Sequence, residues 1–361
     1  MTAITSIGSR WLSLDALRGI TIAGMILVNN PGDWRNTFPI LKHASWDGLT
    51  FADLVFPSFL FIMGVSMALS VGGQLTKGVS KSTIINKGLV RSAKLFLIGL
   101  TLNLLWDHHL DSFRVLGVLQ RIALVNVAVT WAYLWTQPRH WLLYGTIVTV
   151  GATMLLHWPI QPVEGNWYAW LDHLVFGNHV YGGTKPLEAE GILSTLPAIM
   201  TGLLGLWVGH QYRIGGTNGL SSTIGVALGL GTMALVLHLT QLLPSNKLLW
   251  SPTFVFATGA ISILMLNLLK WAEDTNRWAW IWTYFRPIGL NPILIYFLAE
   301  VSEHLWNMQL GGTKVVGWFM MGVSALSPYP FLSSLVWPLF LVTIAVMLGL
   351  LLKRKGIIVK V

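Results

Sequence analysis

Long apolar segments recur along the chain and limit the folds that it can adopt. About ten of them reach the roughly 20 mostly apolar residues that a membrane-spanning helix needs. They lie near residues 12–30, 51–71, 88–106, 115–136, 141–158, 192–210, 219–243, 252–271, 287–306 and 333–352. Only 10% of the residues are charged, whereas soluble domains carry about 25%. We therefore predict an all-α, polytopic membrane protein.

The segments between these spans are too short for a second domain. The longest is 159–191, so residues 1–361 are predicted to form a single transmembrane domain. The stretch 316–325 is apolar but short, and we interpret it as a re-entrant or interfacial piece.

Basic residues are distributed unevenly between the two predicted faces. With ten spans and a cytoplasmic N-terminus, 15 of the 23 Lys and Arg residues fall on the cytoplasmic side. Of the others, Arg18 and Arg121 lie within spans, and Arg35, Lys42, Arg114, Lys185, Lys247 and Lys314 lie on the opposite side. Cytoplasmic loops of membrane proteins carry such an excess of positive charge. We therefore expect both termini in the cytoplasm, and residues 31–50 and 159–191 on the outer face.

Composition excludes several kinds of chemistry. The chain has no Cys, so thiolate nucleophiles and thiolate metal sites are absent. No zinc motif, phosphate loop or dinucleotide fingerprint occurs, and we predict no metal site. The net charge of +9 is attributed to cytoplasmic loops rather than to nucleic-acid binding. The 36 Gly and 19 Trp suit close helix packing and interfacial anchoring, and they permit a homodimer.

A histidine in a short polar loop is the first candidate for chemistry. His43 lies between two apolar segments, and Asp53 opens the second of them. An imidazole with an ordinary pKa near ~6.5 suits proton transfer at neutral pH. Asp53 would serve as a helix N-cap or fix the tautomer of His43.

Inserting an ionisable side chain into the membrane within a span costs about 2.5–3.5 kcal/mol or more. Such a residue therefore usually has an interaction partner or a function. Asp15 and Arg18 share a helix face, so Arg18 either pairs locally or meets phosphate in a cavity. Arg121 follows Gln120 and has no acidic neighbour on its own helix. It either pairs across helices, with Asp15 or Glu190 for instance, or binds an anion in bidentate fashion.

Other polar groups leave two interpretations open. Asn29 and Asn30 end the first span as a helix C-terminal signal, or they orient a substrate or a base. Glu190 precedes the sixth span, as a favourable helix N-terminal charge or as a carboxylate of the outer site. The basic cluster from Lys77 to Lys94 binds lipid headgroups or a polyphosphate. Glu300, Glu303 and His304 share one helix face, interpreted as structural or interfacial.

Several motifs, in order along nearly the whole chain, resemble one family. They are Leu14-Asp15-Ala16-Leu17-Arg18-Gly19, Val28-Asn29-Asn30-Pro31-Gly32, Lys42 to Thr50, Ala52 to Pro57, Gly117 to Arg121, Glu190 to Pro197, Asn246 to Ser251 and Gly289-Leu290-Asn291-Pro292. Together they resemble the transmembrane domain of heparan-alpha-glucosaminide N-acetyltransferase, and still more its bacterial relatives of the NagX type. The His43 loop with the segment from Asp53 to Pro57 is the most specific of these matches.

The resemblance implies a transmembrane acyltransferase that moves acetyl from cytosolic acetyl-CoA to the amine of a glucosamine-type sugar across the membrane. It implies that His43 matches the family's active-site histidine, that Asn29 or Asn30 matches its nearby asparagine, and that Glu190 matches the glutamate of its Asp-Pro-Glu-Gly motif. This chain departs from that motif with Glu188-Ala189-Glu190-Gly191, and Asp47 replaces the asparagine of Trp-Asn-Gly. The bacterial likeness implies an inner-membrane protein with His43 facing the periplasm.

These expectations assign a role to each candidate residue. His43 acts as general base, Asn29 or Asn30 binds the oxyanion, and Asp53 or Glu190 orients the imidazole or binds the amine. Trp46 and Asp47 join Glu190 in the acceptor site. The residues expected at the coenzyme are Arg18, Arg121, Gln120, Lys87, Arg91 and Lys94. The rival mechanism makes His43 a covalent acetyl carrier. The alternative functions are transport of a sugar or lipid-linked substrate, and acyl transfer to a glycan hydroxyl.

Overall fold

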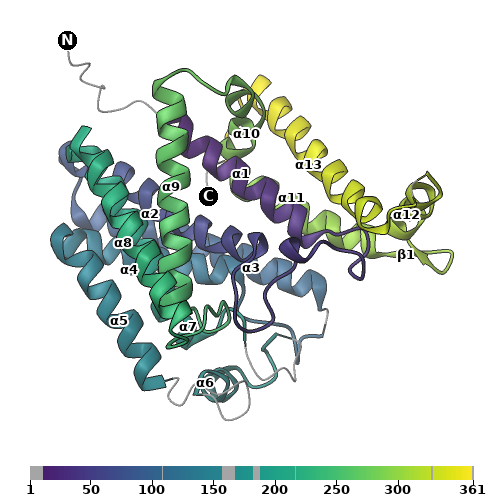
Figure 1. The fold of residues 1–361 in the computed structure, drawn as a ribbon, viewed down its shortest axis with the longest axis horizontal. Helices are drawn as coiled ribbons and strands as arrows, with labels where there is room; N and C mark the ends of the chain where they lie inside the picture. The colour runs from purple at the N-terminus through teal and green to yellow at the C-terminus, as the bar shows by residue number, and fades with distance from the viewer. Residues whose placement is uncertain are drawn as a thin grey trace.

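The computed structural model describes residues 11–107, 109–156, 167–181, 188–215, 217–326 and 328–359. Over this part the chain is almost entirely helical (Figure 1). The long helices are α1 (Leu12–Asn29), α2 (Phe51–Thr76), α3 (Lys81–Trp106), α4 (Val118–Trp135), α5 (Trp141–Leu156), α7 (Ile192–Gly215), α8 (Thr217–Leu239), α9 (Pro252–Asp274), α11 (Pro292–Asn307) and α13 (Pro330–Arg354). Shorter elements are α6 (Trp167–Phe176), α10 (Ala279–Leu290), α12 (Val315–Leu326), the 3-10 turns Pro39–Leu41 and Pro138–His140, and the hairpin β1 (Gln309–Leu310) with β2 (Thr313–Lys314).

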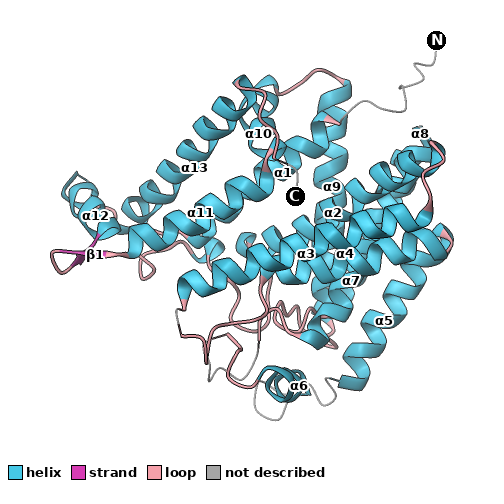
Figure 2. Ribbon diagram, turned by 180° about the vertical axis from the view of Figure 1, so that it is seen from behind, coloured by secondary structure: helices cyan, strands magenta, loops and turns pink. Residues whose placement is uncertain are grey.

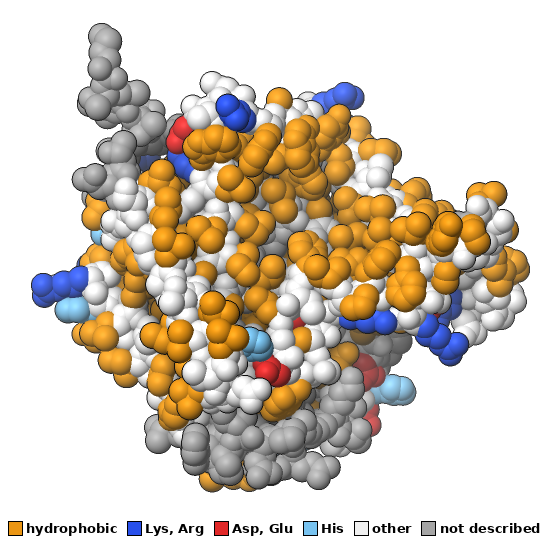
Figure 3. Space-filling view, in the orientation of Figure 1, with side chains coloured by type: hydrophobic (Ala, Val, Ile, Leu, Met, Phe, Trp, Pro, Cys, Tyr) orange, Lys and Arg blue, Asp and Glu red, His pale blue; other side chains and the backbone are white. Residues whose placement is uncertain are grey.

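Eight helices of the described residues are long and apolar enough to cross a membrane: α1, α2, α3, α4, α7, α8, α9 and α13. Hydrophobic side chains are spread over the face shown in Figure 3, and charged groups are few and scattered. A water-facing surface of this kind would be unstable, whereas lipid accommodates it. The predicted fold class, an all-α polytopic membrane protein, is confirmed.

Two of the ten expected spans differ from the prediction. Segment 141–158 is the 16-residue helix α5, and residues 157 and 158 lie outside the described part of the chain. Segment 287–306 is not one helix, because the chain breaks at Asn291 between α10 and α11. Pro292 has no N–H to continue the helical ladder and disfavours helical geometry in the residue before it. The short segment 316–325 lies within α12.

The start of α3 also differs from the expected boundary. The helix begins at Lys81, seven residues earlier than expected, because the Ser80 hydroxyl accepts a hydrogen bond from the backbone N–H of Thr83 (3.3 Å). Lys87, which precedes the expected span, therefore lies on the same helix as Arg91 and Lys94. Their positions along α3 decide which of them can reach the interior.

Close backbone contacts hold the helices that surround the interior. A Cβ added at Gly289 of α10 would lie 1.7 Å from the carbonyl oxygen of Asp15 on α1. A Cβ added at Gly64 of α2 would lie 2.0 Å from the carbonyl oxygen of Gly202 on α7. Small residues allow this approach, which supplies van der Waals contact where lipid offers no hydrophobic drive. Helices α1, α11 and α13 form one side of the molecule, and α4, α5, α7 and α8 the other (Figures 1 and 2).

Candidate active site

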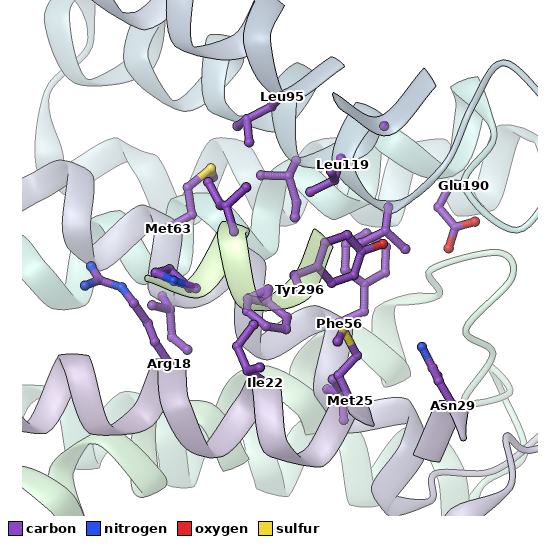
Figure 4. Close-up of a pocket in the computed structure, with 18 of the residues that line it drawn as sticks. Arg18, Ile22, Met25, Asn29, Phe56, Met63, Leu95, Leu119, Glu190 and Tyr296 are labelled. Atoms are coloured by element: carbon purple, nitrogen blue, oxygen red, sulfur yellow. The ribbon is translucent and has the colours of Figure 1, made fainter. Parts of the chain in front are cut away.

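A large cavity occupies the space between α1, α2, α3, α4 and α11. Its volume is about 2280 Å³. Arg18, Ile22, Met25 and Asn29 follow one another along the face of α1 that lines it (Figure 4). Their spacing of three or four residues keeps them on one face, and at 1.5 Å per residue they span about 16 Å. The cavity is therefore elongated in the direction of α1.

The two ends of the cavity carry different chemistry. Arg18, Arg91, Arg213 and Lys270 line one end. His43, Trp46, Glu190 and Lys247 line the other. On α2 the ends are marked by Ser66, which accepts a hydrogen bond from Arg18, and by Asp53, which contacts His43. Their separation of 13 positions corresponds to about 20 Å of helix.

His43 is held by the first turn of α2. Its Nδ1 atom lies 2.8 Å from Oδ1 of Asp53, whose side chain is fully buried. The other carboxylate oxygen accepts hydrogen bonds from the backbone N–H groups of Ala44 (3.1 Å) and Thr50 (3.2 Å), and the latter forms part of a capping box. A carboxylate only accepts hydrogen bonds, so Nδ1 of His43 carries the proton and Nε2 is the unprotonated nitrogen. The imidazole remains 47% exposed.

Asp53 thus fills both roles that the sequence left open. It caps α2 and fixes one tautomer of His43. The arrangement leaves His43 Nε2 able to accept a proton.

An ion cluster holds Glu190 at the cavity wall. Arg114 forms ion pairs with Glu188 and Glu190, and its guanidinium lies over the ring of Tyr181 at 4.8 Å. Burial alone would raise the pKa of Glu190, but Arg114, Arg121 and Lys247 together hold it below its ordinary value. Burial would lower the pKa of Arg114, and the two carboxylates raise it instead. Glu190 is therefore ionised at neutral pH.

Glu188 stands where the Asp-Pro-Glu-Gly motif has its aspartate. Several groups form hydrogen bonds with its carboxylate. Besides Arg114, its carboxylate accepts hydrogen bonds from the backbone N–H groups of Tyr181 (2.7 Å) and Glu190 (3.1 Å). Glu188 is buried and does not line the cavity. The first carboxylate of the motif thus supports the loop that presents the second.

Arg121 lies near Glu190 and far from Arg18. Its guanidinium is fully buried and donates to the hydroxyl of Ser194 and to the carbonyl of Gly191 (3.3 Å). It also lies over the indole of Trp250 at 4.9 Å. Arg121 does not line the cavity. The structure therefore separates it from the end where the sequence grouped it with Arg18, and its contacts hold the start of α7.

Asn29 and Asn30 point in different directions. Asn30 is buried and donates to the carbonyl of Ile26 on its own helix (3.1 Å). Asn29 lines the cavity, as does Glu300 of α11. Of the two, Asn29 is the one that a molecule in the cavity would meet.

Asp47 and Trp46, which were both expected in the acceptor site, also lie in different surroundings. The carboxylate of Asp47 accepts a hydrogen bond from the backbone N–H of Ser245 (2.7 Å), and Asp47 does not line the cavity. Trp46 lines the cavity wall and packs against the buried cluster that contains Tyr168 and Leu249. Asp47 therefore joins two loops, whereas Trp46 faces the interior.

Only some of the basic residues expected at the coenzyme line the cavity. Arg18 and Arg91 line the cavity, whereas Lys87 and Lys94 do not, although Arg91 is as exposed at the surface as these two lysines. Arg18 also pairs with Asp15 (2.9 Å), as one of its two interpretations required. Gln120 lines the middle of the cavity wall beside Gly99, where an added Cβ would lie within 3.0 Å of the Gln120 amide.

Three residues of the cavity had no functional role in the sequence interpretation. Lys247 lies in a motif noted for its resemblance only, and its Nζ is 3.1 Å from Nε2 of His43. Glu300 and Glu303 line the cavity from α11, although their helix face was interpreted as structural. The available signal was their acidic character within an apolar segment, which by default indicates a functional group.

These observations define a class: a polytopic membrane protein with a histidine–carboxylate pair at one end of a long cavity and basic side chains at the other. A family model described as "Heparan-alpha-glucosaminide N-acetyltransferase, catalytic" matches residues 10–241. The chain belongs to this family of N-acetyltransferases, which confirms the resemblance seen in the motifs.

Two relatives show how far the likeness extends. Heparan-alpha-glucosaminide N-acetyltransferase of Mus musculus is 28% identical over 370 residues, which cover 84% of this chain and 55% of the relative. The Homo sapiens protein of the same name is 28% identical over 372 residues, covering 85% of this chain and 55% of the relative. The chain thus spans about half the length of the curated relatives that it matches.

Proposed function

We propose that this protein transfers an acetyl group from cytosolic acetyl-CoA to the amine of a glucosamine-type sugar on the opposite side of the membrane. The observation that carries the proposal is the cavity that joins Arg18 and Arg91 to the His43–Asp53 pair. Family membership supports acetyl transfer as the reaction. It also favours an enzyme over the alternative of a sugar or lipid transporter.

The basic end of the cavity suits the phosphates of the donor. Arg18 and Arg91 supply guanidinium groups, which bind phosphate oxygens in bidentate fashion. Arg213 lines the same end and donates a hydrogen bond to Tyr133 (2.8 Å), which fixes its direction. Beyond this end the cavity is lined by apolar side chains that include Ile22 and Met25 (Figure 4). Such a wall accommodates the extended arm of the coenzyme and carries its thioester towards His43.

His43 is proposed as the general base. Its free Nε2 takes a proton from the amine as the nitrogen attacks the thioester carbonyl, and it then returns that proton to the departing sulfur. Asp53 keeps Nδ1 protonated and stabilises the imidazolium that forms in between. The acetyl C–N bond forms while the C–S bond breaks, so no other reactant is needed.

Polar groups around His43 complete the acceptor site. The amide of Asn29 would donate a hydrogen bond to the developing oxyanion, an effect worth roughly 2.7–4 kcal/mol in other enzymes. Glu190 would attract the cationic amine because it remains ionised. Trp46 offers an aromatic face to the sugar ring. Asp47 and Arg121 have supporting roles in this proposal, since both are bonded outside the cavity.

The proposed orientation follows the charge distribution. An N-terminus in the cytoplasm places Arg18, Arg91 and Arg213 on the cytoplasmic side, where acetyl-CoA is available. His43 then opens towards the opposite side, which would be the periplasm if the protein lies in a bacterial inner membrane.

The proposal is tested by acetyl transfer from acetyl-CoA to glucosamine with purified protein in detergent. Product formed by the native chain and lost in His43→Ala would support it. His238→Ala is a matched control, because His238 lies in α8 and does not line the cavity. If no product forms with amino sugars but acetyl is transferred to glycan hydroxyls, the proposed acceptor is wrong and the proposed donor stands. Absence of any acetyl transfer would refute the proposal.

A further inference from the structure

An amine of the protein itself lies beside the histidine. Lys247 Nζ is 3.1 Å from Nε2 of His43 and 3.4 Å from Nδ1. In the proposed reaction, Nε2 accepts a proton from the attacking amine, which must lie within hydrogen-bonding distance of it. Because Nζ is nearly equidistant from the two ring nitrogens, it lies over the face of the imidazole, and a rotation of the flexible Lys247 side chain brings the ε-amine to the position that an acceptor nitrogen needs.

The backbone around Lys247 is fixed by a tight turn. The backbone N–H of Trp250 donates to the carbonyl of Lys247 (3.2 Å), and that of Ser251 donates to the carbonyl of Asn246 (3.0 Å). Trp250 adopts a left-handed conformation (φ 54°), and its fully buried indole donates to Thr201 (3.1 Å). A non-glycine residue keeps such a conformation only where its surroundings hold it in place. The starting point of the Lys247 side chain is therefore set by the fold.

The same turn is joined to the loop that carries His43. Asp47 accepts a hydrogen bond from the backbone N–H of Ser245 (2.7 Å). In return, the backbone N–H of Gly48 donates to the carbonyl of Ser245 (3.0 Å). These paired contacts hold the two loops in one register, so the approach of Lys247 to His43 results from the backbone arrangement as well as from the side-chain rotamers.

The surroundings favour the reactive form of the amine. Lys247 is half-buried and lines the cavity that Arg18 also lines. Burial lowers the pKa of Lys247, with Glu190 and Asp53 opposing that shift and Arg121 and Arg114 adding to it. A lowered pKa increases the fraction of neutral amine at neutral pH, and only the neutral amine is a nucleophile.

We propose that Lys247 is an internal acetyl acceptor, which the enzyme acetylates from its own donor when no sugar amine is present. The inference rests on the proposed function, since it uses the same thioester and the same base. The Nζ atom attacks the acetyl carbonyl, a C–N bond forms and the C–S bond breaks. One proton passes from Nζ through His43 to the thiolate sulfur. The other, which made Lys247 a cation, has already left to solvent.

Acetylation would also inactivate the site. The product is a neutral amide that no longer accepts acetyl and fills the space next to Nε2 of His43. A sugar amine that enters the cavity displaces Lys247 from Nε2 and protects it. The acceptor therefore competes with self-acetylation for the same base.

The experiment uses purified full-length protein with isotopically labelled acetyl-CoA and no acceptor. Acetyl groups are located by peptide mass spectrometry after acid treatment, which removes acetyl from histidine and leaves acetyl-lysine intact. We expect Lys247 to become labelled. The rate of this labelling should fall about 100-fold or more in His43→Ala. Glucosamine present from the start should suppress it. Lys247→Arg should remove the label, whereas Lys314→Arg should not, because Lys314 is an exposed lysine bonded to Asn307.

Each outcome separates this inference from the proposed function, because the same preparation is assayed for transfer to glucosamine. Transfer without label on Lys247 would overturn the inference and leave the function intact. Equal labelling of Lys42, Lys314 and Lys247, or labelling of Lys247 that does not depend on His43, would indicate non-enzymatic chemistry and overturn it as well. Neither transfer nor label would refute both.

Discussion

Asp53 Oδ1 lies 2.8 Å from Nδ1 of His43, while the second oxygen of the same carboxylate accepts backbone hydrogen bonds at the start of α2. The carboxylate that orients the proposed base is thus part of the signal that begins a membrane helix. The position of the histidine relative to the cavity is set by helix capping, which is a local property of the sequence.

Replacing Asp53 with Asn separates these two roles. The amide oxygen still accepts backbone hydrogen bonds, but the group loses the charge that stabilises the imidazolium. We expect acetyl transfer to fall by roughly 10²–10⁴-fold with little change in the thermal midpoint. Steady-state kinetics and thermal unfolding in detergent measure the two effects. Thr50→Ala is the control, since it weakens the cap and leaves the carboxylate. A loss of activity that only follows a loss of stability would contradict the assigned role.

Arg114 holds two buried carboxylates, and its removal should destabilise the fold. Arg114→Ala leaves Glu188 and Glu190 without their shared partner. Breaking a buried ion pair in this way costs about 3–5 kcal/mol. Arg114→Lys should cost less but not restore the native protein, because an ammonium lacks the planar fork that reaches both carboxylates. An unchanged thermal midpoint in Arg114→Ala would show that the cluster does not stabilise the fold.

The contact between α1 and α10 depends on Gly289. An alanine Cβ there would overlap the carbonyl of Asp15, which is backbone and cannot move aside. We expect Gly289→Ala to destabilise the protein by about 1–3 kcal/mol. Gly225→Ala is the matched control, because Gly225 lies in α8 with no atom within 4 Å of an added Cβ. That change should be neutral or mildly stabilising. Equal effects of the two substitutions would contradict the packing argument.

Asp172 should make stability depend on pH. It lies in α6, and burial raises the pKa of its carboxyl group to about 6 from an ordinary 3.8. The folded state therefore prefers the protonated form, so this contribution to stability is fully present below about pH 4 and is lost as the pH rises through about 6. Asp172→Asn keeps the acceptor for the backbone N–H of Ile192 (2.8 Å) and cannot ionise.

The comparison is the thermal midpoint of both proteins between about pH 4 and pH 7. The native protein should lose stability relative to Asp172→Asn as the pH rises. A constant difference across this range would refute the assignment.

The sequence predicted those features that depend on local pattern. Apolar segment length predicted the membrane helices, and the loop around His43 with Asp53 predicted the histidine–carboxylate pair. The helix break before Pro292 could also be predicted from the sequence, because proline disfavours helical geometry in the preceding residue whatever the tertiary structure. The predicted continuous span 287–306 is therefore wrong for a reason that the sequence itself contains.

Features that depend on contacts between distant segments were not predictable. Arg121 finds Ser194 and Gly191 about 70 residues away, so its separation from Arg18 follows from packing alone. Neighbours in sequence, such as Asn29 and Asn30, point to different surroundings because successive helix positions are rotated by about 100°. Lys247 meets His43 across 204 residues.

The central claim is that one cavity connects a donor on one side of the membrane to an acceptor on the other. Proteoliposomes test it most directly, with acetyl-CoA supplied on the face that carries Arg18 and a membrane-impermeant amino sugar on the face that carries His43. We predict acetylated sugar on the His43 side in native vesicles, none with His43→Ala, and little when the two substrates exchange sides. Product that forms only when donor and acceptor share one side would contradict transfer through the cavity.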